Sequence, residues 1–207
     1  MSDEHGHGHD HEHDHEGHER DHEGHDHEGH DHDHDHTLIV DRLPAGAWTV
    51  DHASSEVLFR AKALWGLLPV TGMFEQFNGE MTVDADGSAS GRLTVGTASL
   101  KTGIGRRDAD LRSASYFDAA NHPEMIFGLE QVAPTGEDHL EVTGTLTIRD
   151  TEIPVVFPIY AIAHGDHLHI EGQILVDHDA AGLGWAKFGM VGKTARAELA
   201  LTLNPAG

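Results

Sequence analysis

The 207-residue sequence contains no cysteine, which excludes disulfide bonds, thiolate metal sites and a cysteine nucleophile. Basic residues are scarce, because 13 Lys and Arg stand against 36 Asp and Glu, and the net charge is −23 at pH 7. A chain this acidic repels the phosphates of nucleic acids and anionic lipids, so we expect neither as a partner. No apolar run is long enough to span a membrane, and the N-terminus lacks the basic start and apolar core of a secretory signal. We therefore expect a cytoplasmic protein without a membrane span.

The N-terminal segment has the composition of a disordered tail. After Met1, its first 36 residues contain no apolar side chain, and they carry a net charge of −13. Such a segment cannot bury enough surface to offset the entropy that ordering would cost. We expect a tail over residues 1–37, a linker over 38–46 and one folded domain over 47–204.

Histidine is the most frequent residue of this tail, which holds fourteen of the 21 histidines in the chain. Neutral imidazole binds zinc, nickel, copper and cobalt ions, and neighbouring carboxylates can complete the ligand shell. Because no histidine pair has the fixed spacing of a structural zinc site, we expect several overlapping sites of modest affinity. The candidate metal ligands are His5, His7, His9, His11, His13, His15, His18, His22, His25, His27, His30, His32, His34 and His36.

Three other interpretations of the tail stay open at this point. A polar, acidic segment can serve only to solvate the protein. It can also be an engineered tag, although tags are usually plain histidine runs without interleaved acids and glycines. Third, it can sense pH, because histidine titrates near pH 6.5, and full protonation of its imidazoles would move the charge of the tail from −13 to +1.

In the rest of the chain, apolar and polar residues alternate with the period of two that is typical of half-buried β-strands. In residues 139–148, for example, Val142 and Leu146 share one face. Pro158 indicates a bulge or an edge position in its strand, and only residues 106–118 are suited to a turn or two of helix. This pattern is typical of an all-β antiparallel barrel or sandwich. The predicted strands cover residues 56–63, 92–98, 124–129, 139–148, 155–162, 167–176 and 194–203.

An antiparallel barrel of about eight strands can enclose one small ligand, and the alternative is a barrel filled by its own side chains. The predicted inward faces are aliphatic and aromatic, so a cavity there would be apolar. Residues 64–70 are unusually apolar for a connection and could form a lip over the barrel mouth or a plug inside it. The candidate ligand-binding residues are Phe59, Trp65, Leu67, Phe74, Phe77, Phe127, Val142, Leu146, Phe157, Ile174 and Trp185.

Residues 37–207 contain no catalytic motif, so we expect a protein that is not an enzyme. His164, His167 and His169 could bind a metal ion, but solvated side chains are the commoner outcome for histidines on a polar strand face. The charged residues of segment 106–118 predict a salt-bridged corner that holds this irregular part of the chain. These residues are Arg106, Arg107, Asp108, Asp110, Arg112 and Asp118.

A series of short motifs runs along residues 47–204. The motifs are Trp48 with Asp51 and Ser54, Gly72-x-Phe74, Ser99-x-x-Thr102, Arg107-Asp108-x-x-Leu111-Arg112, Phe117-Asp118, Pro123 with Phe127, and Gly144-x-Leu146-Thr147. This series resembles the YceI-like family of lipocalin-like proteins, and the resemblance covers nearly the whole predicted domain.

The resemblance implies an eight-stranded antiparallel barrel whose apolar tunnel holds a polyisoprenoid or a similar chain. It also implies a carrier, often a homodimer, that is not an enzyme. Many relatives are exported, whereas we expect no signal sequence in this chain. Relatives also often carry an arginine in the region of residues 176–190, where this chain has His178. Our leading hypothesis is a cytoplasmic binder of an apolar chain with a metal-binding tail. The alternative is a metal buffer or metal-stress protein in which the barrel mainly carries the tail.

Overall fold

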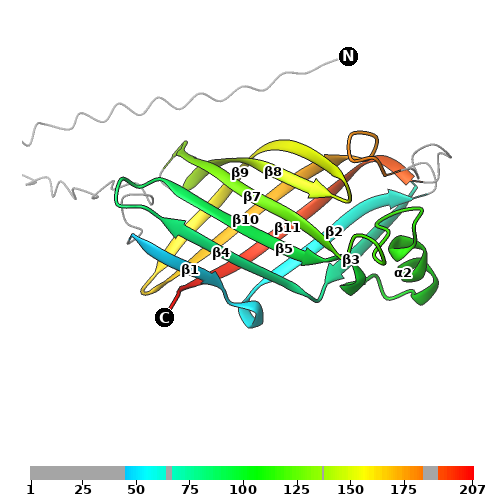
Figure 1. The fold of residues 1–207 in the computed structure, drawn as a ribbon, viewed down its shortest axis with the longest axis horizontal. Coiled ribbons are helices and arrows are strands. Elements are labelled where there is room, and N and C mark those ends of the chain that lie inside the picture. Colours follow the sequence, from blue (N-terminus) through cyan, green and yellow to red (C-terminus); the bar gives the residue numbers. More distant parts are fainter. Residues whose placement is uncertain (1–44, 64–66, 137, 184–190) are drawn as a thin grey trace, which may run out of the picture. The chain divides into compact units, whose positions relative to one another are not determined.

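The computed structural model describes residues 45–63, 67–136, 138–183 and 191–207 (Figure 1). The predictions for the tail, for the linker up to residue 44, and for Trp65 and Trp185 lie outside these residues. The described helical elements are η1 (His52–Ser54), η2 (Thr97–Ser99) and α2 (Gly105–Arg112). The described strands are β1 (Gly46–Val50), β2 (Glu56–Ala63), β3 (Leu68–Phe74), β4 (Phe77–Val83), β5 (Ala89–Gly96), β6 (Leu100–Lys101), β7 (Glu124–Pro134), β8 (His139–Ile148), β9 (Thr151–His164), β10 (His167–Asp177) and β11 (Val191–Pro205).

The strands form one antiparallel sheet that closes into a barrel (Figure 1). The order around the ring is β1-β4-β5-β7-β8-β9-β10-β11, and β11 pairs back with β1. Along one edge of β11, the residues up to Ala200 pair with β2, and the residues from Leu203 onward pair with β1. Strands β1 and β2 are therefore two parts of one long strand. Strands β3 and β4 continue one another in the same way, and so do strands β6 and β5. The described residues therefore confirm the predicted all-β antiparallel barrel of eight strands, with one short α-helix.

Each predicted strand overlaps an observed one, but the predicted set has no counterpart of β1, β3, β4 or β6, and β3 shows why. Residues 64–70 were interpreted as a connection, whereas Leu68 to Val70 already belong to this strand. The period of two in β3 is carried by Val70 and Phe74, which are buried, and is masked by the apolar Pro69 and Met73 on the outer side. Leu67 is 78% exposed and Leu68 50% exposed, so neither packs as a plug in the interior.

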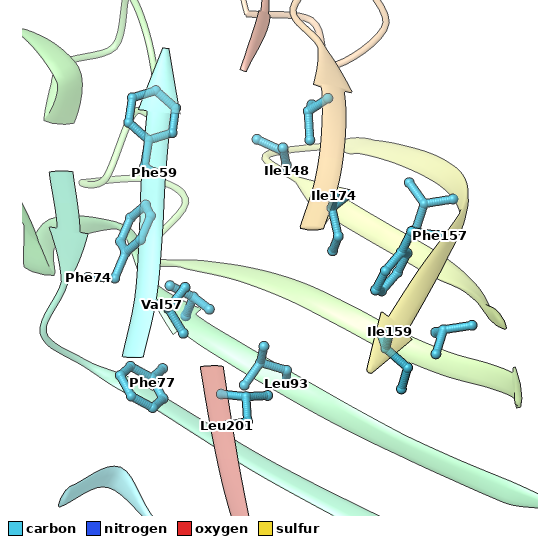
Figure 2. Close-up of a cluster of buried hydrophobic side chains, with 14 of the residues drawn as sticks. Val57, Phe59, Phe74, Phe77, Leu93, Ile148, Phe157, Ile159, Ile174 and Leu201 are labelled. Atoms are coloured by element: carbon cyan, nitrogen blue, oxygen red, sulfur yellow. The ribbon is translucent and has the colours of Figure 1, made fainter. Parts of the chain in front are cut away.

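Alternating side chains from all parts of the ring build an apolar interior. In β9, Val155, Phe157 and Ile159 are buried, whereas Val156 between them is exposed. Figure 2 shows Phe59 and Ile174 pointing into the interior from different walls of the barrel. The interior is therefore built as the alternation of apolar and polar residues predicts.

Glycine at one inward position leaves room for an aromatic ring. A Cβ atom at Gly144 of β8 would lie 2.7 Å from ring carbons Cε2 and Cζ of Phe127 and 2.3 Å from the carbonyl oxygen of Gly128. Both distances are shorter than the contact distances of non-bonded heavy atoms. The absence of a side chain at Gly144 thus lets the Phe127 ring lie against the barrel wall.

We predict that Gly144→Ala destabilises the domain by about 1–3 kcal/mol, because the added methyl group forces the Phe127 ring and the neighbouring backbone to shift. Gly128→Ala is the matched control, since a Cβ there meets only the carbonyl oxygen of Thr145, at 3.9 Å. The control should stay within about 0.5 kcal/mol of the original protein. Urea unfolding followed by circular dichroism measures both changes, and equal destabilisation by the two variants would contradict the placement of the ring.

The corner at α2 is held mainly by hydrogen bonds to the turn before the helix. Asp108 accepts hydrogen bonds from the backbone N–H of Thr102, at 2.9 Å, and from the Thr102 hydroxyl group. Arg107 donates to the Thr102 hydroxyl oxygen at 2.8 Å and to its carbonyl oxygen at 2.9 Å, and Arg112 donates to the carbonyl oxygen of Leu100. The predicted cluster therefore does hold the irregular segment, but its arginines bind the turn. The hydrogen bond from the Thr102 hydroxyl lowers the pKa of Asp108, and the backbone N–H and the two arginines add to this effect.

We predict that Asp108→Ala costs about 1–3 kcal/mol at neutral pH, because the half-buried backbone N–H and hydroxyl group of Thr102 lose their acceptor. The folded-state pKa of Asp108 lies below its unfolded value near 3.9. The ionised carboxylate therefore stabilises the fold fully above that pH, and this stabilisation is lost as the pH falls through the folded-state pKa. Urea unfolding at pH 7 and at about pH 3 should show a smaller difference between original protein and variant at the lower pH. Asp110→Ala, at an exposed position of the same helix, is the control.

Candidate ligand-binding cavity

The barrel interior contains two apolar cavities. The larger has a volume of about 110 Å³ and extends toward the β4–β5 turn at Gly87. The smaller has a volume of about 70 Å³ and extends toward Phe59 and Tyr116. For scale, a cavity of about 150 Å³ lined by Leu, Ile and Phe stays dry and binds benzene in another protein. The two cavities therefore favour an apolar occupant, and each is small for a long chain.

Most of the predicted ligand-binding residues within the described part of the chain line these cavities. Phe77 lines neither cavity, because its ring stacks on His52 with centroids 4.5 Å apart. Leu67 is exposed, and Trp65 and Trp185 lie outside the described residues. The larger cavity is lined by Phe127, Val142 and Phe157, and the smaller by Phe59, Phe74, Phe127, Leu146 and Ile174.

Three residues line both cavities and mark their junction: Leu93 on β5, Phe127 on β7 and Leu199 on β11. Leu93 and Phe127 are direct partners on neighbouring strands. Strands β7 and β11 lie on opposite sides of the ring, so Phe127 and Leu199 approach the junction from facing walls. The Phe127 ring also packs edge-on against Phe157, with ring centroids 5.6 Å apart. A chain that occupied both cavities would have to pass this junction.

An aromatic cluster closes the smaller cavity at the end near α2. Phe117 packs edge-on against Phe59, Phe74 and Tyr116, with ring centroids 4.6–6.2 Å apart. Tyr116 and Phe117 are 1% and 2% exposed. Neither residue was among the candidate ligand-binding residues, although an adjacent pair of aromatic residues in a polar segment was the available signal. They form a plug at this end of the barrel, whereas a lip or a plug had been considered for residues 64–70.

A buried polar pair fixes the chain beside this plug. Tyr116 and His178 are each 1% exposed, and the Tyr116 oxygen lies 3.0 Å from Nε2 of His178. Nδ1 of His178 lies 2.6 Å from the carbonyl oxygen of Gly192. Because a carbonyl oxygen only accepts, Nδ1 carries the proton, and the Tyr116 hydroxyl donates to Nε2. Burial raises the pKa of the Tyr116 hydroxyl, which therefore stays protonated at neutral pH. The pair joins the segment after β10 to the plug and to β11.

The described residues offer no second site of obvious chemistry. Among residues 45–63, 67–136, 138–183 and 191–207, no three His, Asp or Glu side chains are grouped so that they could hold a metal ion. The ring centroids of His164 and His167 are 6.1 Å apart, and Nε2 of His169 lies 3.3 Å from Oε1 of Glu171. In the same part of the chain, no helix has the length and apolar character needed to cross a bilayer. Within the described residues, the apolar interior is therefore the candidate functional site.

Comparison with curated proteins finds relatives that align with part of this chain. It is 36% identical over 97 residues to a UPF0312 protein of Enterobacter sp. (strain 638), with 46% of this chain and 50% of the relative covered. It is 34% identical over 97 residues to Protein YceI of Escherichia coli O157:H7, with the same coverage. The chain thus spans about half the length of the curated relatives it matches.

Solved structures share the barrel fold. Burkholderia cenocepacia BcnA matches with a TM-score of 0.69 at 25% identity, covering 74% of this chain and 98% of BcnA. A polyisoprenoid binding domain from Saccharophagus degradans matches with a TM-score of 0.64 at 15% identity, covering 77% of this chain and 98% of that domain. At this identity the second likeness concerns the fold alone. The YceI-like domain itself matches residues 48–203, which is most of the chain, and the protein therefore belongs to the YceI-like domain family.

Proposed function

We propose that the barrel binds an apolar chain, such as a polyisoprenoid or a similar lipid, and carries it without catalysing a reaction. The observation that carries this proposal is the pair of apolar cavities inside a closed barrel. The similar fold of a domain described as polyisoprenoid binding supports it. A chain of this kind has no charge along its length, so its transfer from water into the barrel is favoured by about 0.8 kcal/mol for each buried methylene group.

A long chain needs more space than the two cavities now offer. Their volumes are about 110 and 70 Å³, and Phe127 stands at the junction between them. Side chains in cores change rotamer, whereas the hydrogen-bonded wall of a closed barrel does not widen easily. We therefore infer that a long chain displaces the Phe127 ring and joins the two cavities, while a short chain fits in one of them.

We predict that Val142→Phe weakens binding of a fluorescent fatty acid by about tenfold or more, because the added ring occupies the larger cavity. Val142 is 4% exposed and lines that cavity, which has a volume of about 110 Å³ and so has room for the ring. Thr143→Phe is the matched control, since Thr143 is the next residue of β8 and points to the opposite face. Fluorescence titration measures the dissociation constants. Equal affinities for the two variants would contradict binding in the interior.

We also propose that the histidine-rich tail binds transition-metal ions, with zinc, nickel, copper and cobalt as the candidates. The support is its composition, fourteen histidines interleaved with carboxylates within 36 residues. The alternative function, a metal buffer in which the barrel mainly carries the tail, rests on the same feature. A cytoplasmic location and a homodimeric state also stay predictions, and native mass spectrometry of the purified protein tests the oligomer directly.

We predict that removing residues 1–36 abolishes most binding of nickel and zinc ions. Calorimetric titration of the full chain and of a variant beginning at Thr37 measures the stoichiometry. Because protons compete for the imidazole nitrogens, binding by the full chain should also fall as the pH is lowered from about 7.5 to about 5.5. An unchanged stoichiometry after removal of the tail would refute the proposal for the metal and leave the proposal for the barrel intact.

A further inference from the structure

One part of the barrel wall lacks backbone pairing. The pairing of β9 with β10 begins where His164 faces His167 and continues to Ile159 and Gly172. Within the described residues, the pairing ends there. Both strands nevertheless continue, β9 back to Thr151 and β10 on to Asp177. We call the unpaired stretches, residues 152–158 of β9 and 173–177 of β10, the β9–β10 seam. In Figure 2, β9, which carries Phe157, curves away from β10, which carries Ile174.

The sequence of β9 explains why the pairing ends. The backbone N–H of Ala161 donates to the carbonyl oxygen of Asp138, which precedes β8. Because successive residues of a strand direct their N–H groups to opposite sides, the even-numbered residues of β9 face β10. Two of the three even positions from 154 to 158 are Pro154 and Pro158, which have no N–H to donate. A bulge or an edge position was predicted at Pro158, and the end of the pairing at Ile159 leaves Pro158 on an edge toward β10.

The side chains at the middle of the seam are apolar. On the inner side, Phe157 is 6% exposed and Ile174 4% exposed. On the outer side, Val156 is 61% exposed and Leu175 is 65% exposed, and they fall opposite each other if the pairing is continued beyond Gly172. Phe157 lines the larger cavity and Ile174 the smaller one. The seam therefore runs beside the junction of the two cavities.

The rest of the described wall is harder to open. Each of the other neighbouring strand pairs would have to break ladder hydrogen bonds between backbones to separate, leaving polar groups unpaired in an apolar interior. At the end near α2, Tyr116 and Phe117 form the plug. Opening the seam breaks no ladder hydrogen bond, and an incoming apolar chain would cover the apolar side chains that are exposed at its middle.

We propose that the β9–β10 seam is the site at which a long, linear apolar chain, an acyl or isoprenoid chain, passes sideways into the barrel. This proposal rests on the proposed function of the barrel. The chain slides between Val156 and Leu175, parts Phe157 from Ile174 and reaches both cavities at their junction. The seam is bounded at one end by the pairing of Gly172 with Ile159 and at the other by the turn after β10.

The test joins the two sides of the seam covalently. Because the chain has no cysteine, the variant Val156→Cys/Leu175→Cys presents two exposed thiols that a short bis-maleimide can bridge. The matched control is Ile162→Cys/His169→Cys, which places the same bridge across a pair of residues that already face each other in the ladder. Stopped-flow fluorescence with cis-parinaric acid measures uptake and release. Bridging the seam should slow both rates by about tenfold or more at little change in affinity, and bridging the control should change neither.

Equal uptake rates for the two bridged proteins would overturn the proposal. If the original protein bound no cis-parinaric acid at all, the proposed function would fail instead. Hydrogen exchange on the original protein gives a reading without ligand, because the N–H of Val156 faces the seam while that of Phe157 faces β8. The Val156 amide should exchange much faster than the Phe157 amide, and equal protection would show that the seam is closed by hydrogen bonds.

Discussion

The return of β11 to the first strand of the chain is the constraint on which the rest of the structure depends. One edge of β11 pairs with β2 and then with β1, and this closes a meander of antiparallel strands into a ring. Closure removes the exposed edges of an open sheet and gives every strand one inward face. Apolar residues then gather inside without a second sheet or a covering helix. The interior is hollow because the sheet is closed and the inward side chains do not fill the enclosed volume completely.

Small inward residues decide where the interior stays hollow. Gly144 lets the Phe127 ring lie against the wall, and a Cβ at Gly172 would meet Ile159 at 2.8 Å. Aromatic rings close the interior at the end near α2, where Phe117 packs against Phe59 and Phe74. The balance of glycines and rings thus sets the shape of the cavities, while the register of the strands sets their position.

The alternation of residues predicted an antiparallel barrel or sandwich, and the resemblance to the YceI-like family selected the barrel. Most of the candidate ligand-binding residues in the described part of the chain line its cavities. Val142, Phe157 and Ile174 could be assigned to the inner face because the period of two is local. The junction could not be predicted, since Leu93 and Leu199 meet Phe127 only through the curvature and closure of the sheet. Strand β3 was missed because the apolar Pro69 and Met73 on its outer face hide its alternation. The plug at Tyr116 and Phe117 was not predicted, because local composition does not show which segment folds back across the end of the barrel.

The same sequence encodes both the wall and its weakest part. Pro154 and Pro158 stand where β9 would have to donate to β10, so the ladder ends although both strands continue. The wall is therefore rigid where its backbones are hydrogen-bonded and deformable where only side chains meet. A container that holds an apolar chain needs both properties, because it must exclude water and still exchange its cargo.

Xenon is the most direct probe of the central claim, that the barrel is hollow and apolar inside, because it enters dry apolar cavities without specific contacts. Crystals equilibrated with xenon gas should show xenon density in the interior on either side of Phe127, at positions lined by Val142 and by Ile174. An interior without xenon, packed throughout by its own side chains, would contradict the account.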